Sequence, residues 1–224
     1  MKTATSKKLI VAIDGPAGSG KSTVTHMLAK KLKYTHIDTG ALYRAIALRA
    51  IELEIPLTDG AAIGELAASS NLEFKKAKIY LDNRDVSALI RTPEISLAAS
   101  QISAHPEVRS ALLGLQRKMG EKGGVVLEGR DIGTVVFPNA HVKFFLTASV
   151  DSRATRRMVE LEEKGTYLDF DEVRKQVMDR DRGDTERKVA PLKKADDAVE
   201  IDTTQMTVEQ VVENLAKTVR ARES

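Results

Sequence analysis

The sequence contains no cysteine, few aromatic residues and no long apolar run. Without cysteine, disulfide bonds and thiolate metal sites are excluded. Phe, Tyr and Trp make up only 4% of the residues, which argues against a surface that stacks single-stranded nucleic acid. No apolar run reaches about 18 residues, so no membrane-spanning helix is expected. The histidines do not have the spacing of a metal site; they are His26, His36, His105 and His141.

The first residues of the chain are polar and lead into a short apolar stretch, Leu9–Ile13. That stretch is too short for the apolar part of a signal peptide, and no small-residue cleavage site follows it. These features favour a cytoplasmic protein with no membrane partner.

Charge is nearly balanced, because 35 Lys and Arg residues stand against 32 Asp and Glu residues. A net charge of +3 does not favour nucleic acid as a partner. Arginine, unlike lysine, is clustered, and clustered arginine suits phosphate recognition because the planar guanidinium binds two oxygens at once. A solvated helix face is the alternative. The first arginine group is Arg153, Arg156 and Arg157, and the second is Arg174, Arg180, Arg182 and Arg187.

Short apolar strands alternate with amphipathic helical segments in the first 54 residues and again after residue 124. This order predicts an α/β fold with a parallel sheet covered by helices on both faces. The expected strands are 8–13, 35–37, 125–127, 142–146 and 198–201; the expected helices are 21–33, 39–54, 151–164, 169–182 and 208–219.

The middle of the chain has a different pattern. Apolar and polar residues alternate on both sides of a Lys75–Lys78 turn, which predicts an antiparallel hairpin. Two helices are expected at 93–103 and 106–121, each with proline at an early position. The sequence therefore predicts a single domain over 1–224 in which an α+β insertion, at about residues 58–121, interrupts the α/β core.

A glycine-rich motif lies between the first expected strand and the first expected helix. It matches G-x-x-x-x-G-K-[ST] in the context that this motif requires. Its glycines let the backbone wrap around an anion, and the N–H groups of the loop and helix then point at phosphates. Lys21 can reach the β- and γ-phosphates, and Ser22 can bind Mg²⁺. The expected nucleotide-binding residues are Gly15, Pro16, Ala17, Gly18, Ser19, Gly20, Lys21, Ser22 and Thr23.

The loop by itself predicts a nucleoside triphosphate without separating a kinase from a GTPase, a helicase or a transport motor. No N-K-x-D motif for reading guanine is present, which weakens the GTPase interpretation. No later strand ends in four apolar residues followed by Asp, the usual second motif of such proteins.

Two polar motifs follow expected strands instead: Asp38–Arg44, which begins D-T-G, and Glu128–Asp131, which reads E-G-R-D. In doubly wound sheets ligands bind at the carboxyl ends of the strands, so both motifs are expected to face the same crevice as the glycine-rich loop. The alternatives are helix capping by Asp38 and a surface ion pair between Arg130 and Asp131.

Arg180, Asp184 and Arg187 are spaced by four and three residues, which predicts one side of a helix or helix end. An i,i+4 salt bridge is the alternative. The first arginine group likewise shares a helix face, which could close over a triphosphate as a lid or be merely solvated.

These residue types suit phosphoryl transfer to a phosphate acceptor. Two polyanions must approach to about 3 Å, and several cationic side chains with Mg²⁺ offset their repulsion. An acceptor phosphate has a second pKa of about 6, so it is a dianion at neutral pH and needs no strong general base. No His–carboxylate base motif lies near these segments, in agreement with that chemistry.

The chain closely resembles the bacterial cytidylate kinase family along nearly its whole length. The G-R-D-x-G-T-V-V-F-P stretch is highly specific to that family, whereas the glycine-rich loop is not. Asn139 is a departure, because the family usually has Asp there, and little effect is expected from it. The matching stretches are Ile13–Thr23, Ile37–Arg44, Ile90–Thr92, Glu128–Pro138, Arg180–Asp181, Ala190–Leu192 and Ile201–Thr204.

The resemblance implies a P-loop kinase core, a helical lid near residues 151–165, a monophosphate-binding role for the insertion, and transfer from ATP, with Mg²⁺, to CMP or dCMP. It assigns the acceptor phosphate to Arg44, Arg130 and Arg187, cytosine to Ser100, Arg109 and Asp131, and the ribose to Arg180 and Asp184. The residues expected to take part in catalysis are Lys21, Arg44, Arg130, Asp131 and Arg157; Arg153 and Arg157 would contact ATP, and Asp38 and Thr39 the acceptor.

The assignment of the base readers is chemically consistent. Cytosine offers an N4 amino donor beside acceptors at N3 and O2, so Asp131 could accept from N4 and Arg109 could donate to N3 or O2. Uracil reverses the polarity at N3 and at position 4, and CMP and dCMP are therefore expected well ahead of UMP.

The rival enzyme is a P-loop kinase for dTMP, UMP or shikimate, against which the E-G-R-D motif and the large insertion argue. A non-catalytic nucleotide- or RNA-binding module, suggested by a pI of about 9.0, and a regulatory P-loop switch are the rivals of another class. No nucleic acid partner is expected, and nothing in the sequence demands more than a monomer.

Overall fold

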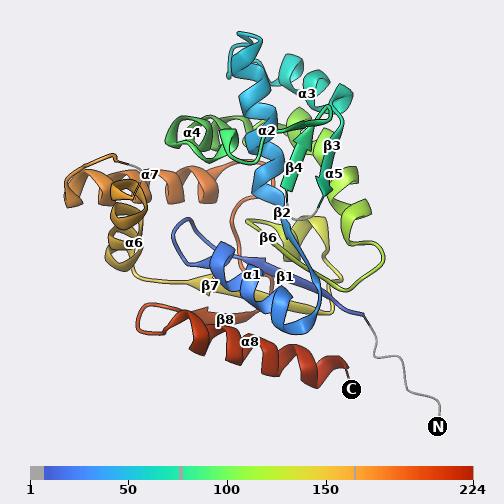
Figure 1. The fold of residues 1–224 in the computed structure, drawn as a ribbon, viewed down its shortest axis with the longest axis vertical. Coiled ribbons are helices and arrows are strands. Elements are labelled where there is room, and N and C mark those ends of the chain that lie inside the picture. The colour runs from blue at the N-terminus through green and yellow to red at the C-terminus, as the bar shows by residue number, and fades with distance from the viewer. Residues whose placement is uncertain (1–7, 76–77, 164, 224) are drawn as a thin grey trace. The chain divides into compact units, whose positions relative to one another are not determined.

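The structure, a computed structural model, describes residues 8–75, 78–163 and 165–223 (Figure 1). The chain forms two compact units. Unit 1 comprises the described residues within 1–37, 122–186 and 190–224, and unit 2 comprises those within 38–121 and 187–189. None of the described helices is both long enough and apolar enough to cross a membrane.

Unit 1 is built on a five-stranded sheet with the strand order β2-β6-β1-β7-β8. The central strand β1 runs parallel to β6 and to β7, and β7 runs parallel to β8. The predicted parallel sheet is therefore confirmed. Its strands are β1 (Ile10–Asp14), β2 (Thr35–Asp38), β6 (Val125–Gly129), β7 (Val142–Thr147) and β8 (Val199–Asp202).

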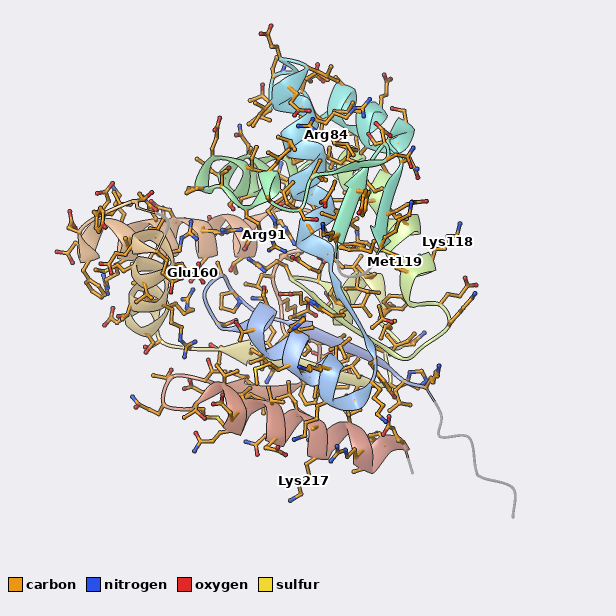
Figure 2. All side chains as sticks on the ribbon, in the orientation of Figure 1. Arg84, Arg91, Lys118, Met119, Glu160 and Lys217 are labelled. Atoms are coloured by element: carbon orange, nitrogen blue, oxygen red, sulfur yellow. The ribbon has the colours of Figure 1, made fainter. Side chains whose placement is uncertain are left out.

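Two helices, α1 (Lys21–Leu32) and α8 (Val208–Glu223), lie side by side against the sheet (Figure 1). Their apolar sides form one core with Val11 and Ile13 of β1. The opposite side of α8 is polar, and Lys217 points away from that helix (Figure 2). Each helix therefore buries one face, as its sequence pattern predicts.

The other face of the sheet carries a π-helical segment, η2 (Ile132–Val136), which packs on β1 and β6. Side chains alternate along a strand, so Asp14 points away from the face to which Ile13 contributes. It therefore faces η2, whose backbone it contacts. The predicted helical cover on both faces is confirmed, although η2 itself was not predicted.

Unit 1 also contains a helix pair, α6 (Val150–Glu162) and α7 (Phe170–Glu186), which share a small apolar core. Lys164, at the end of the predicted helix 151–164, lies outside the described residues. The helix α7 ends four residues later than predicted, at Glu186 instead of residue 182. Asp184 therefore lies on a helix, and Arg187 directly follows it.

The described residues of unit 2 form four helices and a three-stranded sheet in the order β3-β4-β5. The predicted antiparallel hairpin is confirmed, with Leu72 opposite Leu81 and Phe74 opposite Ile79. Residues 76–77, in the predicted turn, lie outside the described residues. The elements are α2 (Thr39–Glu52), α3 (Gly60–Ser69), β3 (Leu72–Lys75), β4 (Lys78–Leu81), β5 (Arg84–Asp85), the 3₁₀ turn η1 (Leu89–Arg91), α4 (Pro93–Ile102) and α5 (Pro106–Gly120).

The core of unit 2 explains why this unit begins at Asp38, whereas the predicted insertion begins at about residue 58. Leu42 and Ile46 of α2 are fully buried in one cluster with Ile63 of α3 and Ile102 of α4. The helix α2 therefore packs with the elements that follow it. Neither α3 nor the two-residue strand β5 was predicted from the sequence.

Candidate active site

The glycine-rich loop joins β1 to α1 as the sequence predicts. Gly20 caps α1 in a left-handed conformation with φ of 84°, and Gly18 has φ of 74°. Gly15 is fixed by a close approach, since a Cβ atom there would lie 2.0 Å from the carbonyl oxygen of Leu146. Glycine is therefore required at position 15 by β7 itself.

Lys21 folds back over the loop. Its Nζ donates to the carbonyl oxygen of Pro16 and to Ser19 Oγ, at 2.5 and 3.2 Å, and the residue is only 6% exposed. Burial lowers the pKa of the Lys21 ammonium well below its usual value, and the charge of Arg130 lowers it further. The negative charge of a polyphosphate in the loop would favour the ammonium form again.

Ser22, the next residue, donates its hydroxyl to Glu128 Oε2 at 2.7 Å, and His36 Nε2 contacts Glu128 Oε1 at 2.9 Å. Glu128 is buried near the end of β6, the strand beside β1. Glu128 was not among the predicted site residues, because the pattern expected for this role was four apolar residues followed by Asp. The run V-V-L followed by Glu was the available signal.

The Ser22–Glu128 pair fits Mg²⁺, whose ligands are oxygens. Among the described residues, no group of three His, Cys, Asp or Glu side chains could hold a metal by itself. In nucleotide sites Mg²⁺ usually has one or two protein oxygens as ligands beside phosphate oxygens and water.

Arg130 follows β6 and pairs with a residue of α7. Its Nε donates to Asp184 Oδ2 at 2.7 Å. Burial lowers the pKa of the Arg130 guanidinium, but the Asp184 carboxylate more than offsets this and raises it. Asp131 is itself buried, so the alternative of a surface ion pair between Arg130 and Asp131 is wrong. Arg180, one turn before Asp184 on α7, is partly buried.

The first arginine group occupies three different environments on α6. Arg153 is buried, donates to both carboxylate oxygens of Asp181, and also donates to the carbonyl oxygen of Ala17 in the loop. Arg156 donates to the carbonyl oxygens of Gly18 and Thr203. Only Arg157 fits the alternative of a solvated face, because it is partly exposed and pairs with Glu160 one turn away.

In unit 2, Asp38 does two things at the start of α2. Its Oδ1 accepts the N–H of Ala41 at 3.1 Å, which is the predicted alternative of helix capping. Its Oδ2 pairs with Arg44 at 2.6 Å and with Arg91, labelled in Figure 2, at 3.2 Å. Asp38 therefore caps the helix and holds two arginines together. Thr39, the first residue of α2, is buried beside it.

Two of the three predicted base readers, Ser100 and Arg109, lie in unit 2, whereas Asp131 lies in unit 1. Arg109 is buried on α5, donates to the carbonyl oxygen of Ser103 at 3.3 Å, and lies 5.6 Å above the ring centre of Tyr43. Ser103 donates its hydroxyl to the carbonyl oxygen of Ser100. Arg187 donates to that same hydroxyl at 3.5 Å. Ser103, which sequence reasoning missed, thus connects three predicted residues.

A parallel sheet whose first strand leads through G-P-A-G-S-G-K-S into a helix defines the class of P-loop nucleotide-binding proteins. Solved structures show the same fold. An uncharacterized protein from Eubacterium ventriosum superposes with a TM-score of 0.53 at 15% identity, covering 96% of this chain and 99% of its own. Shikimate kinase from Bacteroides thetaiotaomicron superposes with a TM-score of 0.50 at 14% identity, covering 95% and 98%.

The particular family follows from closer relatives. The cytidylate kinase family model matches residues 11–221. Cytidylate kinase of Syntrophotalea carbinolica is 50% identical over 97% of this chain and 94% of its own length. That of Citrifermentans bemidjiense is 52% identical over 96% and 94%. The chain belongs to the cytidylate kinase family, which confirms the resemblance, and it is a kinase that phosphorylates CMP with ATP.

Proposed function

We propose that this chain transfers the γ-phosphoryl group of ATP to CMP and to dCMP, with Mg²⁺ as the metal, and that the residues described above divide the work between donor and acceptor. The observation that carries the proposal is in unit 1. The loop lysine, the Ser22–Glu128 pair and the partly buried Arg130 all stand at the carboxyl ends of β1 and β6. That end of a parallel sheet is where ligands bind.

The donor is held by the loop, Gly15 to Thr23, whose N–H groups face the β- and γ-phosphates. Lys21 would turn from its contacts with Pro16 and Ser19 to the phosphate oxygens. Ser22 and Glu128 would hold Mg²⁺, which when bound neutralises part of the phosphate charge. Supporting this, Glu128 accepts the hydroxyl of Ser22 at the G-K-S end of the loop.

The acceptor phosphate would be held by Arg44, Arg130 and Arg187, as the family resemblance implies. One of its oxygens attacks the γ-phosphorus, the bond to the bridging oxygen of ADP breaks, and CDP or dCDP forms. Three guanidinium groups suit the charge on the transferred group. Asp38 and Thr39 would support Arg44, since Asp38 already pairs with it.

Cytosine would be read by Asp131, Arg109 and Ser100, and the ribose would be held by Arg180 and Asp184. Supporting this, Arg109 is buried with its guanidinium oriented by Tyr43 and Ser103. A buried, oriented donor discriminates strongly between N3 of cytosine and N3–H of uracil, because a mismatched polar group would be left unpaired.

Arg157 would contact the triphosphate as part of a lid at about 151–165. Its present partner, Glu160, forms a partly exposed pair, and such pairs are worth only about 0–1 kcal/mol. Arg157 can therefore change partners at little cost. Arg153 is held by Asp181 and contacts Ala17, so it would support the loop while ATP binds.

We place this reaction in the cytoplasm, where ATP and CMP are available, and assign it to a monomer, because one chain contains every residue given a role here. Pyrimidine nucleotide metabolism is the corresponding process.

The test is ADP formation from ATP and Mg²⁺ with CMP, dCMP, UMP, AMP and dTMP as separate acceptors. We expect turnover mainly with CMP and dCMP, and none from a Lys21→Met control that remains folded. Equal turnover with UMP would overturn the base assignment. Nucleotide binding without turnover would favour a binding module. Unchanged ATP-dependent turnover of Arg157→Ala would remove the lid role of that residue alone.

A further inference from the structure

Asp14, the last residue of β1, is a buried carboxylate that the proposed mechanism does not use. It is 4% exposed. Its Oδ1 accepts the N–H of Ile132 at 2.8 Å, and its Oδ2 accepts the N–H of Gly133 at 2.7 Å. Because both oxygens accept a backbone N–H, Asp14 is not placed to act as a base or to bind phosphate.

Ile132 and Gly133 end a short segment that begins at Gly129, and Asp14 also lies beside the beginning of this segment through its backbone. In the parallel pairing of β1 with β6, Asp14 stands opposite Gly129. Asp14 is therefore beside the chain at Gly129 and bonded to it at Ile132 and Gly133. Between these points lie only Arg130 and Asp131, the two residues assigned to the acceptor phosphate and to cytosine.

The next residue after Asp14 is Gly15, where the glycine-rich loop begins. Gly15 is itself held against β7, because a Cβ there would meet Leu146. The start of the donor-binding loop and the segment with Arg130 and Asp131 are therefore tied to one residue. A small displacement of Asp14 would move the segment with Arg130 and Asp131, whereas Gly15 is also constrained by β7.

The fit around Asp14 is tight. A Cβ atom at Gly133 would lie 3.3 Å from Asp14 Oδ2 and 3.1 Å from Lys143 Cδ. Burial raises the pKa of Asp14 to about 6, against the lowering effect of its two N–H partners, and Asp131 raises it further. At neutral pH Asp14 is therefore still mainly a carboxylate, although its burial favours the neutral form.

We infer that Asp14 is a positioning residue for phosphoryl transfer: by holding the backbone on both sides of Arg130 and Asp131, it fixes these side chains relative to the loop that binds ATP. It acts through them and touches neither substrate. The inference rests on the proposed roles of Arg130 and Asp131.

The experiment is a double-mutant cycle of Asp14→Asn and Arg130→Gln, with kcat and the KM values for CMP and ATP measured separately. Asparagine keeps the shape, but its amide group turns a donor toward an N–H. We expect kcat/KM for CMP to fall on the order of 100-fold, the cost of a misplacement of about 1 Å. The KM for ATP should change less than about 3-fold, because the phosphate-binding backbone of the loop is held elsewhere.

The coupling distinguishes positioning from a general loss of structure. In the Arg130→Gln background, Asp14→Asn should lower kcat/KM by less than about 3-fold. A full multiplicative loss in that background would overturn the inference, as would an Asp14→Asn enzyme with unchanged kcat/KM. Asp169→Asn is the matched control, since Asp169 likewise accepts a backbone N–H, that of Glu172, at the start of α7. It should keep its kcat/KM.

Failure of the proposed function is recognised separately. If Arg130→Gln leaves kcat/KM unchanged, the role of Arg130 fails and the inference fails with it. If Arg130→Gln is impaired and Asp14→Asn is not, only the inference fails. Should Asp14→Asn not fold, Gly133→Ala, which crowds the same carboxylate, replaces it in the cycle with the same expected coupling.

Discussion

The Nε of Arg130 lies 2.7 Å from Asp184 Oδ2, in a pair that joins the end of β6 to α7 across 54 residues of sequence. Arginine and aspartate are both shielded from water there, with side chains 21% and 7% exposed. The pair keeps the Arg130 guanidinium charged and oriented. This guanidinium lies near the glycine-rich loop, since its charge lowers the pKa of Lys21. The arrangement holds positive charge where two polyanions must meet.

Replacing Asp184 by Asn should leave Arg130 buried without its counter-charge. Breaking a buried pair costs about 3–5 kcal/mol, and partial exposure of Arg130 places this one at the lower end. We expect a lower melting temperature and a higher KM for CMP, measured by thermal unfolding and steady-state kinetics. Asp179→Asn is the control, because its pair with Arg182 is exposed. Equal effects of both variants would contradict this account.

Two glycine-to-alanine variants should have opposite effects. Gly15→Ala places a Cβ 2.0 Å from a backbone oxygen of β7, so the loop must shift and ATP binding should be lost. Gly114 lies on α5 with nothing within 4 Å of a Cβ, and alanine there should stabilise the helix by about 0.5–1 kcal/mol. Titration with ATP and thermal unfolding measure the two outcomes. Normal ATP binding by Gly15→Ala would show that the approach to Leu146 is not maintained.

Glu128→Gln should increase the Mg²⁺ concentration needed for half-maximal activity about 10-fold or more. Losses of this size are typical when a residue that binds a metal, or supports one of its ligands, is replaced. It removes the negative charge that Ser22 and His36 contact. The measurement is turnover against Mg²⁺ at saturating ATP, together with Mg²⁺-dependent binding of ADP. Glu213→Gln, an exposed site on α8 paired with Lys31, is the control and should not shift the curve. An unshifted Glu128→Gln curve would remove Glu128 from the metal site.

The titration of Asp14 should also make the free energy of unfolding depend on pH. Its pKa is about 6 in the folded state and 3.8 in the reference state, so the folded state binds the proton more tightly and stability falls as pH rises between these values. The full difference is about 3 kcal/mol. The facing charges are Asp131 and Lys21.

Asp14→Asn lacks this titration, so its unfolding free energy should rise relative to the parent protein by up to about 3 kcal/mol between pH 4 and 7. Chemical denaturation at several pH values measures this difference. Parallel curves for the two proteins would show that Asp14 does not titrate in this window. A variant that gains stability at neutral pH while losing kcat/KM would separate the positioning role from a structural one.

Arg109→Lys should lower selectivity for CMP over UMP about 10-fold or more, since lysine keeps the charge but not the planar fork that is proposed to read the base. The ratio of kcat/KM for the two acceptors is the measurement. Arg117→Lys, exposed on the same helix α5, should leave the ratio unchanged. If both variants retain the parent ratio, Arg109 does not read the base.

The glycine-rich loop, the individual strands of the parallel sheet and the antiparallel hairpin could all be predicted, because each depends on residues close together in sequence. Partners distant in sequence could not. Asp14 and Ile132 are 118 residues apart, and no residue near Asp14 in the sequence indicates a hydrogen bond with the backbone of Ile132. The spacing of Arg153, Arg156 and Arg157 correctly placed them on one helix, but only the fold shows that Arg153 is paired with Asp181.

Helical periodicity likewise predicted α2 without showing what it packs against. Its apolar residues would suit a sheet or other helices equally well, and the structure places them in the core of unit 2. The helix α3 escaped prediction because its sequence, G-A-A-I-G-E-L-A-A-S, is rich in small residues and glycine, which give a weak periodic signal. Glu128 was missed because only Asp was expected after an apolar strand.

Unit 2 has its own apolar core, separate from the one that α1 and α8 form on the sheet of unit 1. Substitutions that repack one core are therefore not obliged to disturb the other. Variation around Ser100 and Arg109, two of the proposed base readers, can accumulate in unit 2 without repacking the sheet of unit 1 that carries the glycine-rich loop. A lineage of such enzymes can change its acceptor without having to reinvent its use of ATP.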